Sequence, residues 1–172
     1  MNSLLIFVIC AGAAFWTMVL YRDVKKYRAQ VDNAWSQVTA QLEERNLLAS
    51  NLADAASSYM NGQVEPLKKA LLDRTAAAKE NDFSTKRQSE EALSHALNSF
   101  LETAVSQADF STNSDFTTIR KRLVKTDERI RLVNEFYNNQ ALVYNTRISI
   151  MPERLVAQCS GFKPAAFFDV HI

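Results

Sequence analysis

Apolar side chains recur every three or four residues over two long stretches of the chain. This spacing places them on one face of a helix and is typical of helices that pack lengthwise against other helices. The stretch near the C-terminus predicts one long helix on the face formed by Phe116, Ile119, Leu123, Thr126, Ile130, Val133, Tyr137, Gln140, Tyr144, Arg147 and Met151. The stretch nearer the N-terminus predicts another on the face formed by Val24, Arg28, Val31, Trp35, Val38, Leu42, Arg45, Ala49, Leu52, Ala56 and Tyr59.

Two shorter helices are predicted between the long ones. Gly62 readily takes the left-handed conformation that ends a helix, and Pro66 fits the first turn of a new helix over residues 65–79. A kinked continuation of the first helix is the alternative. A third helix is expected over residues 86–108, and Pro152 ends the last long helix because it lacks a backbone donor. The predicted face of the third helix carries Leu93, Leu97, Phe100, Leu101 and Ala104.

An uncharged apolar segment, Leu4 to Tyr21, precedes these helices. As a helix it spans about 27 Å, enough for the hydrocarbon core of a bilayer, and Trp16 lies towards its C-terminal end, where interfacial aromatics belong. A cleaved signal peptide and a lipoprotein at Cys10 are the alternatives. However, the basic residues follow the segment, and Ile9 stands where a lipoprotein needs a small residue. We expect an uncleaved single-pass anchor in the inner cell membrane, with the bulk of the chain cytoplasmic.

The expected fold is all-α. A single N-terminal transmembrane helix continues into an antiparallel four-helix bundle with two long helices, the first and the last, and two shorter ones. The expected parts are an anchor at residues 1–21, a bundle at 22–160 and an aromatic C-terminal tail at 161–172. The long helices would run roughly 50 to 60 Å and the second only about 22 Å. The membrane-proximal part is therefore predicted to be a stalk of the first and last helices, alone or with the lower end of the third, that needs another subunit or a partner to cover its aromatic residues.

A Tyr-Asn pair, Tyr137 and Asn138, recurs one heptad later as Tyr144 and Asn145. Seven residues are about two helical turns, so both pairs lie on one face. One interpretation is a polar recognition site. The other is a buried hydrogen-bonded layer that sets helix register, and it is favoured because these side chains offer no general base near neutral pH. The predicted interaction or register residues are Val31, Trp35, Tyr137, Asn138, Tyr144 and Asn145, with Arg45, Arg74 and Arg147 expected beside the Tyr-Asn set.

The charge balance argues against nucleic acid as a partner. Lys and Arg number 20 against 19 Asp and Glu, so no overall field attracts a polyanion. A basic run over residues 120–131 is interrupted by Asp127 and Glu128 and adjoins no aromatic stacking platform. A solvated helix face is the favoured interpretation of this run, and Asp127 with Arg131 is expected to form an ordinary surface pair.

The sequence offers no constellation for catalysis, a metal or a cofactor. His95 has no Cys, His or paired carboxylate three or four residues away, and the glycines form no phosphate-binding loop. Cys10 and Cys159 are far apart, so a disulfide framework is not expected. We therefore predict a protein that is not an enzyme and holds neither a cofactor nor a metal.

Several segments resemble the LemA family. They are VDNAWSQV (Val31 to Val38), LEERNLLASNLADAASSY (Leu42 to Tyr59) and YNNQALVYNTRISIMP (Tyr137 to Pro152), with Arg74, the ERI at 128–130, Gly161-Phe162 and Phe167-Phe168. The resemblance covers nearly the whole chain, although VSQADFS (105–111) departs from the family's pattern, as in a divergent member. It implies a bacterial single-pass membrane protein with an antiparallel helical bundle and no known catalytic activity. Some relatives take part in magnetosome membrane formation, and many are encoded near membrane metallopeptidases.

The predicted function is that of a non-enzymatic, membrane-anchored helical-bundle scaffold that acts through protein–protein contacts. Its expected partners are the lipid bilayer and either itself, as a homo-oligomer, or other membrane proteins, among them a membrane metallopeptidase. One alternative is an accessory or adaptor of a membrane metalloprotease. Another is a membrane-shaping protein whose aromatic tail, with Phe162, Phe167 and Phe168, enters the membrane interface.

Overall fold

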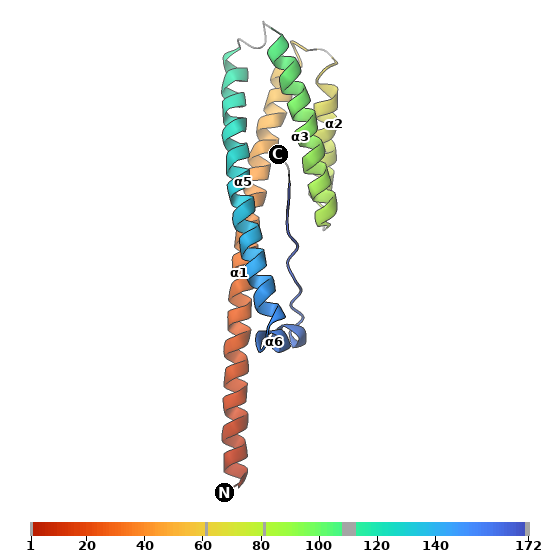
Figure 1. The fold of residues 1–172 in the computed structure, drawn as a ribbon. Coiled ribbons are helices and arrows are strands. Elements are labelled where there is room, and N and C mark those ends of the chain that lie inside the picture. Colours follow the sequence, from red (N-terminus) through yellow and green to blue (C-terminus); the bar gives the residue numbers. More distant parts are fainter. Residues whose placement is uncertain (1, 61, 81, 108–112, 171–172) are drawn as a thin grey trace. The chain divides into compact units, whose positions relative to one another are not determined.

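The computed structural model describes residues 2–60, 62–80, 82–107 and 113–170, with side chains from residue 6 onwards (Figure 1). Its helices are α1 (Asn2–Ala56), α2 (Glu65–Ala77), α3 (Phe83–Ser106), α5 (Ser114–Ser149) and α6 (Glu153–Cys159). The described residues contain helices and no strand, which confirms the all-α prediction. The apolar N-terminal segment continues into the rest of α1 without a break, as predicted. The end predicted for the third helix, Ala108, lies outside the described residues.

Local sequence explains the helix ends. Gly62 has a φ of 83° after α1, and Pro66 lies in the first turn of α2. The side chain of Asp82 caps α3 by accepting hydrogen bonds from the amides of Ser84 and Thr85. The predicted breaks at Gly62 and Pro152 are thus confirmed, and α2 is a separate helix.

The chain divides into two compact units, and the division crosses both long helices. Unit 1 comprises Met1–Ser36 with Phe136–Phe167, and unit 2 comprises Gln37–Glu135 with Phe168–Ile172. The predicted division into an anchor, a bundle and a tail, with boundaries after residues 21 and 160, stays a prediction. Each unit is described by itself below.

Unit 2 contains segments of α1, α2, α3 and α5 around one apolar core. The predicted 3–4 positions supply most of that core, because they lie on the inward faces of their helices. At the end of α1 the structure differs, since Met60 is buried and Tyr59 is half exposed. The core residues are Leu48, Ala49, Leu52, Ala53, Ala56, Met60, Val64, Leu67, Leu93, Leu97, Phe100, Ala104, Phe116 and Leu123.

Unit 1 combines the first 36 residues, the last turns of α5, helix α6 and an extended segment that follows it. Val24, Val31 and Ala34 of α1 are buried, as are Tyr137 and Tyr144 of α5. The prediction that two helices alone form this part of the chain was wrong. The extended C-terminal segment contacts α5 and covers its two tyrosines, so this chain supplies cover that was expected from a partner.

Helix α1 begins with an apolar surface that nothing in unit 1 buries. The exposed fractions of Ile6, Phe7, Phe15 and Trp16 are 60, 74, 71 and 64 %. By length and composition this helix is able to cross a membrane, and it is the one helix among the described residues that meets this test. Exposure of so much apolar area in water is unfavourable and is typical of a surface that meets another apolar phase.

Candidate functional site: a backbone clasp and a buried ionic layer

The Tyr-Asn repeat of α5 holds the chain's own C-terminal segment in unit 1. The hydroxyl of Tyr137 donates to the carbonyl oxygen of Ala166 at 2.7 Å, and that of Tyr144 donates to the carbonyl oxygen of Lys163 at 3.0 Å. The side-chain amide of Asn145 donates to the carbonyl of Ala165 and accepts from its N–H, both at 2.8 Å. We call these three side chains the backbone clasp, because every one of these bonds reaches main-chain atoms.

The heptad spacing of the repeat follows from this arrangement. Tyr137 and Tyr144 are seven residues apart on a helix, which corresponds to about 10.5 Å. Their acceptors on Lys163 and Ala166 are three residues apart in an extended segment, which corresponds to about 10 Å. The two lengths match, so one face of α5 pairs with the extended segment, which runs antiparallel to the helix.

Aromatic and cationic side chains of unit 1 surround the clasp. The rings of Trp35 and Tyr137 lie 5.2 Å apart between centroids, and the guanidinium carbon of Arg28 lies 5.7 Å from the centre of the Tyr144 ring. Burial raises the pKa of the Tyr137 hydroxyl and of the Tyr144 hydroxyl, and nearby Arg28 offsets part of each shift. Both hydroxyls therefore remain protonated donors at neutral pH, as their bonds to carbonyl oxygens require.

The burial and hydrogen bonding of Tyr137 and Tyr144 agree with a buried polar layer, although their partner is the extended tail, and a recognition role stays a prediction. The structure directs Tyr137, Tyr144 and Asn145 to the tail backbone, whereas the sequence suggested a layer between helices or an open recognition site. Asn138 is half-buried in the same unit, and Val31 is buried. The three arginines expected beside the repeat do not all belong to its unit. Arg147 stacks on Tyr27 at 5.4 Å and pairs with Glu153 at 3.5 Å, whereas Arg45 and Arg74 belong to unit 2.

The three tail phenylalanines have different environments. Phe162 is half-buried against Tyr21, with ring centroids 5.8 Å apart, and Phe167 is 55 % exposed. Phe168 is 1 % exposed, and its ring lies 6.0 Å from that of Phe83 in unit 2. A buried ring is not available to a bilayer surface, so Phe168 does not fit the predicted membrane-interface tail. Membrane contact by Phe162 and Phe167 stays a prediction.

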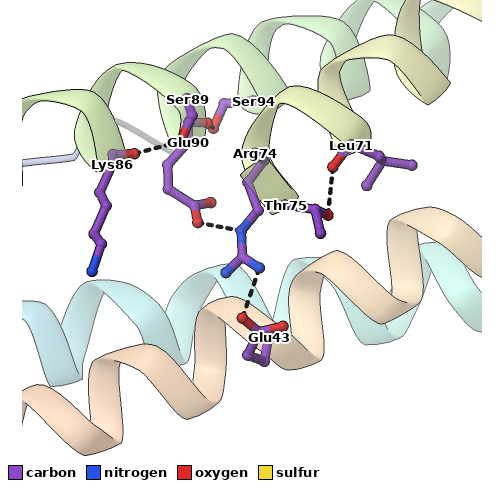
Figure 2. A network of polar contacts seen from close by, with 8 residues as sticks. All are labelled: Glu43, Leu71, Arg74, Thr75, Lys86, Ser89, Glu90 and Ser94. Carbon is purple, nitrogen blue, oxygen red and sulfur yellow. Dashed lines mark hydrogen bonds and ion pairs between the residues drawn. The ribbon is translucent and has the colours of Figure 1, made fainter. Parts of the chain in front are cut away.

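Unit 2 contains a buried ionic layer centred on Arg74 of α2. Its Nε donates to Glu90 of α3 at 2.7 Å, and its Nη1 donates to Glu43 of α1 at 2.7 Å (Figure 2). Arg74 and Glu90 are both buried, while the Glu43 side chain is 60 % exposed. Burial raises the pKa of the Glu90 carboxyl, and Arg74 opposes that shift. Removal of one member would leave the other charged and unpaired inside the protein.

A second ion pair belongs to the same layer. Arg45 of α1, with an exposed fraction of 1 %, lies 2.8 Å from Asp127 of α5, although the alignment does not meet hydrogen-bond geometry. The expected surface pair of Asp127 with Arg131 was therefore wrong. Burial raises the pKa of the Asp127 carboxyl, with Arg45 opposing the shift. The members of the layer are Glu43 and Arg45 of α1, Arg74 of α2, Glu90 of α3 and Asp127 of α5.

Sequence reasoning missed Glu90, although a signal was present. Glu90 precedes Leu93 by three residues and Leu97 by seven, so it continues the apolar face of α3. A carboxylate at an apolar position is a marker for a buried partner of opposite charge. Arg45 and Arg74 carry the same signal, and pairing them with particular acids required the structure.

The remaining polar candidates are on the surface. His95 and both free cysteines are exposed. In the part of the chain that the structure describes, no three His, Cys, Asp or Glu side chains are grouped as a metal site would need. Arg120, Arg129 and Arg131 are exposed, and Arg122 lies 3.7 Å from Glu44. These placements agree with the predicted solvated face.

One family model matches a range of residues that includes the backbone clasp and the ionic layer. The model described as the LemA family matches residues 34–171. The match includes every member of both sets, and it begins after the apolar N-terminal segment has ended at Tyr21. No curated protein matches the chain.

Proposed function

This chain belongs to the LemA family, and from that premise we propose that it is a non-enzymatic scaffold, anchored in a bacterial cell membrane, that assembles through protein–protein contacts. Its apolar segment crosses the bilayer once, and the bulk of the chain forms a cytoplasmic four-helix bundle with one long helix at each end of its sequence. The uncovered apolar surface of α1 from Ile6 to Trp16 supports the anchor.

The hydrogen bonds and ion pairs of the clasp and the ionic layer support a structural role for these polar side chains rather than a catalytic one. Tyr137, Tyr144 and Asn145 are engaged with the tail backbone, and Arg74 is engaged with two carboxylates. Groups committed to bonds within the chain stabilise a shape rather than act on a substrate. This is the function class that the family resemblance implies.

One observation carries the proposal of assembly. Phe136 and Val143 of α5, and Ile150 directly after its last residue, recur every seven residues in unit 1, and their exposed fractions are 46, 45 and 48 %. A heptad stripe of apolar residues is the pattern with which one helix packs along another. We propose that this stripe packs against a second copy of the chain, because single-pass anchors hold neighbouring copies parallel and at high local concentration.

Cysteine crosslinking in intact membranes tests the proposal. Val143→Cys, in a background with Cys10→Ser and Cys159→Ser, is expected to give a disulfide-linked product of twice the chain mass of 19.4 kDa. Asn33→Cys, at an exposed polar position on α1, is the matched control and should stay monomeric.

A crosslinked product whose mass is not a multiple of the chain mass would show that the partner at this stripe is another membrane protein and not a second copy. A membrane metallopeptidase is the alternative partner. Absence of any product from Val143→Cys, under conditions in which the thiol is reactive, would refute assembly through this stripe.

A further inference from the structure

A groove lies between the apolar segment and helix α6, entirely within unit 1. It encloses about 820 Å³. Ala13, Ala14 and Trp16 line one wall, and Pro152, Leu155 and Val156 line the other, with no charged residue in the lining. Its size falls in the range of sites that bind small apolar molecules.

The surface beside the groove is apolar as well. Ile150, Met151 and Leu155 are 48, 62 and 53 % exposed around the start of α6. Large side chains clustered in this way are unfavourable in water and are typical of a short helix that lies in the interfacial region of a membrane. Arg154 and Lys163 are exposed close by in the sequence and supply positive charge.

The position of the groove determines what fills it. One wall belongs to the C-terminal half of the apolar segment, which under the proposed function lies in the bilayer, with Trp16 near its surface. At that depth the surrounding medium is hydrocarbon and headgroup rather than water. Arg22, Lys25 and Lys26 follow the segment directly, so cationic side chains stand where phosphate groups of the cytoplasmic leaflet lie.

We propose that the groove between α1 and α6 binds an acyl chain of an anionic phospholipid and that α6 lies in the headgroup region of the same leaflet. This inference rests on the proposed anchor. The occupant is a phospholipid because the lining is apolar, basic side chains outnumber Asp23 and Glu153 in the neighbouring sequence, and both walls meet at the interfacial end of the segment.

Three single-tryptophan versions of the full chain, reconstituted in vesicles of phosphatidylcholine and phosphatidylglycerol, test the placement of α6. The first retains Trp16 through Trp35→Phe, the second retains Trp35 through Trp16→Phe, and the third adds Met151→Trp to both replacements. With brominated phospholipid in the vesicles, emission from positions 16 and 151 should fall by about twofold or more, and Trp35, which packs on Tyr137, should be unaffected. Quenching at position 16 without quenching at position 151 would overturn the inference and leave the anchor intact. Absence of quenching at position 16 would refute the anchor itself.

Retention of lipid tests the groove directly. Ala14→Phe fills the groove, and Ala11→Phe adds the same bulk to the same helix at a position outside the lining. Native mass spectrometry of the detergent-purified full chain should detect bound phosphatidylglycerol on the unmodified protein and on Ala11→Phe, with at least a roughly fivefold loss on Ala14→Phe. Equal retention by the two variants, or no lipid on the unmodified chain, would overturn the assignment.

Discussion

Replacement of Asn145 tests the backbone clasp at its most specific point. The Asn145 side chain makes two 2.8 Å hydrogen bonds to Ala165, one as donor and one as acceptor. Asn145→Ala removes both and leaves the N–H and carbonyl of a residue that is 9 % exposed without these partners. The rest of α5 should be unaffected, because alanine is a strong helix former.

The size of the effect follows from the bonds lost. A net contribution of about 1 kcal/mol per hydrogen bond gives about 2 kcal/mol for Asn145→Ala, or roughly a thirtyfold larger population of the released tail. Tyr144→Phe removes one bond and keeps the ring, so about 1 kcal/mol and roughly a fivefold increase are expected. Asn145→Asp replaces the donor with a carboxylate oxygen that faces the carbonyl oxygen of Ala165, so it should release the tail at least as much as Asn145→Ala.

Limited proteolysis of the full chain in detergent micelles measures this population. Chymotrypsin cuts after Phe162 and Phe167 only when the extended segment leaves α5, and the cleavage rate follows the open fraction when closing is fast. Asn139→Ala, at an exposed position on the same helix, is the matched control and should cleave at the unmodified rate.

A rise of less than about threefold for Asn145→Ala would refute the reasoning, because the clasp would then contribute less than one ordinary hydrogen bond. An equal rise in Asn139→Ala would refute it too, since the effect would then belong to the helix and not to the tail.

The ionic layer supports two further predictions, both measured by urea denaturation of the full chain. Arg74→Met should lower the free energy of unfolding by about 3 to 5 kcal/mol because buried Glu90 loses its partner. The double variant Arg74→Met with Glu90→Leu should recover most of that loss. A double variant no more stable than Arg74→Met alone would contradict the argument. The pKa of the Glu90 carboxyl is raised in the folded state. The contribution of this carboxyl to the free energy of unfolding is therefore fully present below its pKa in the unfolded chain and is lost as pH rises through its pKa in the folded chain. Glu90→Gln should therefore flatten the decline of stability as pH rises above the ordinary pKa of a glutamate carboxyl, whereas an unchanged slope would assign the decline to Asp127, whose pKa burial also raises.

The helices and most of their inward faces follow from the amino-acid sequence alone. The 3–4 spacing in α1 and α5 predicted most of the buried residues, among them Val31, Leu52, Leu123 and Tyr137, because helical period and apolar burial are both local properties of the chain. The ends of the predicted faces were wrong, since Tyr59 and Met151 are exposed. Gly62 and Pro152 marked helix ends for equally local reasons. The doubled Tyr-Asn motif indicated a polar face on α5, although it did not identify the C-terminal segment as the partner of that face.

The partner of that face depends on how distant parts of the chain pack together. The tail from Phe162 to Phe168 has no periodic pattern, so nothing local predicts that it extends along α5, and the matching lengths of two helical turns and three extended residues become visible only when both are placed together. The pairing of Asp127 with Arg45 of α1, rather than with Arg131 on its own helix, is equally non-local. A charged residue shows in the sequence that it needs a partner, and packing of distant helices determines which partner it has.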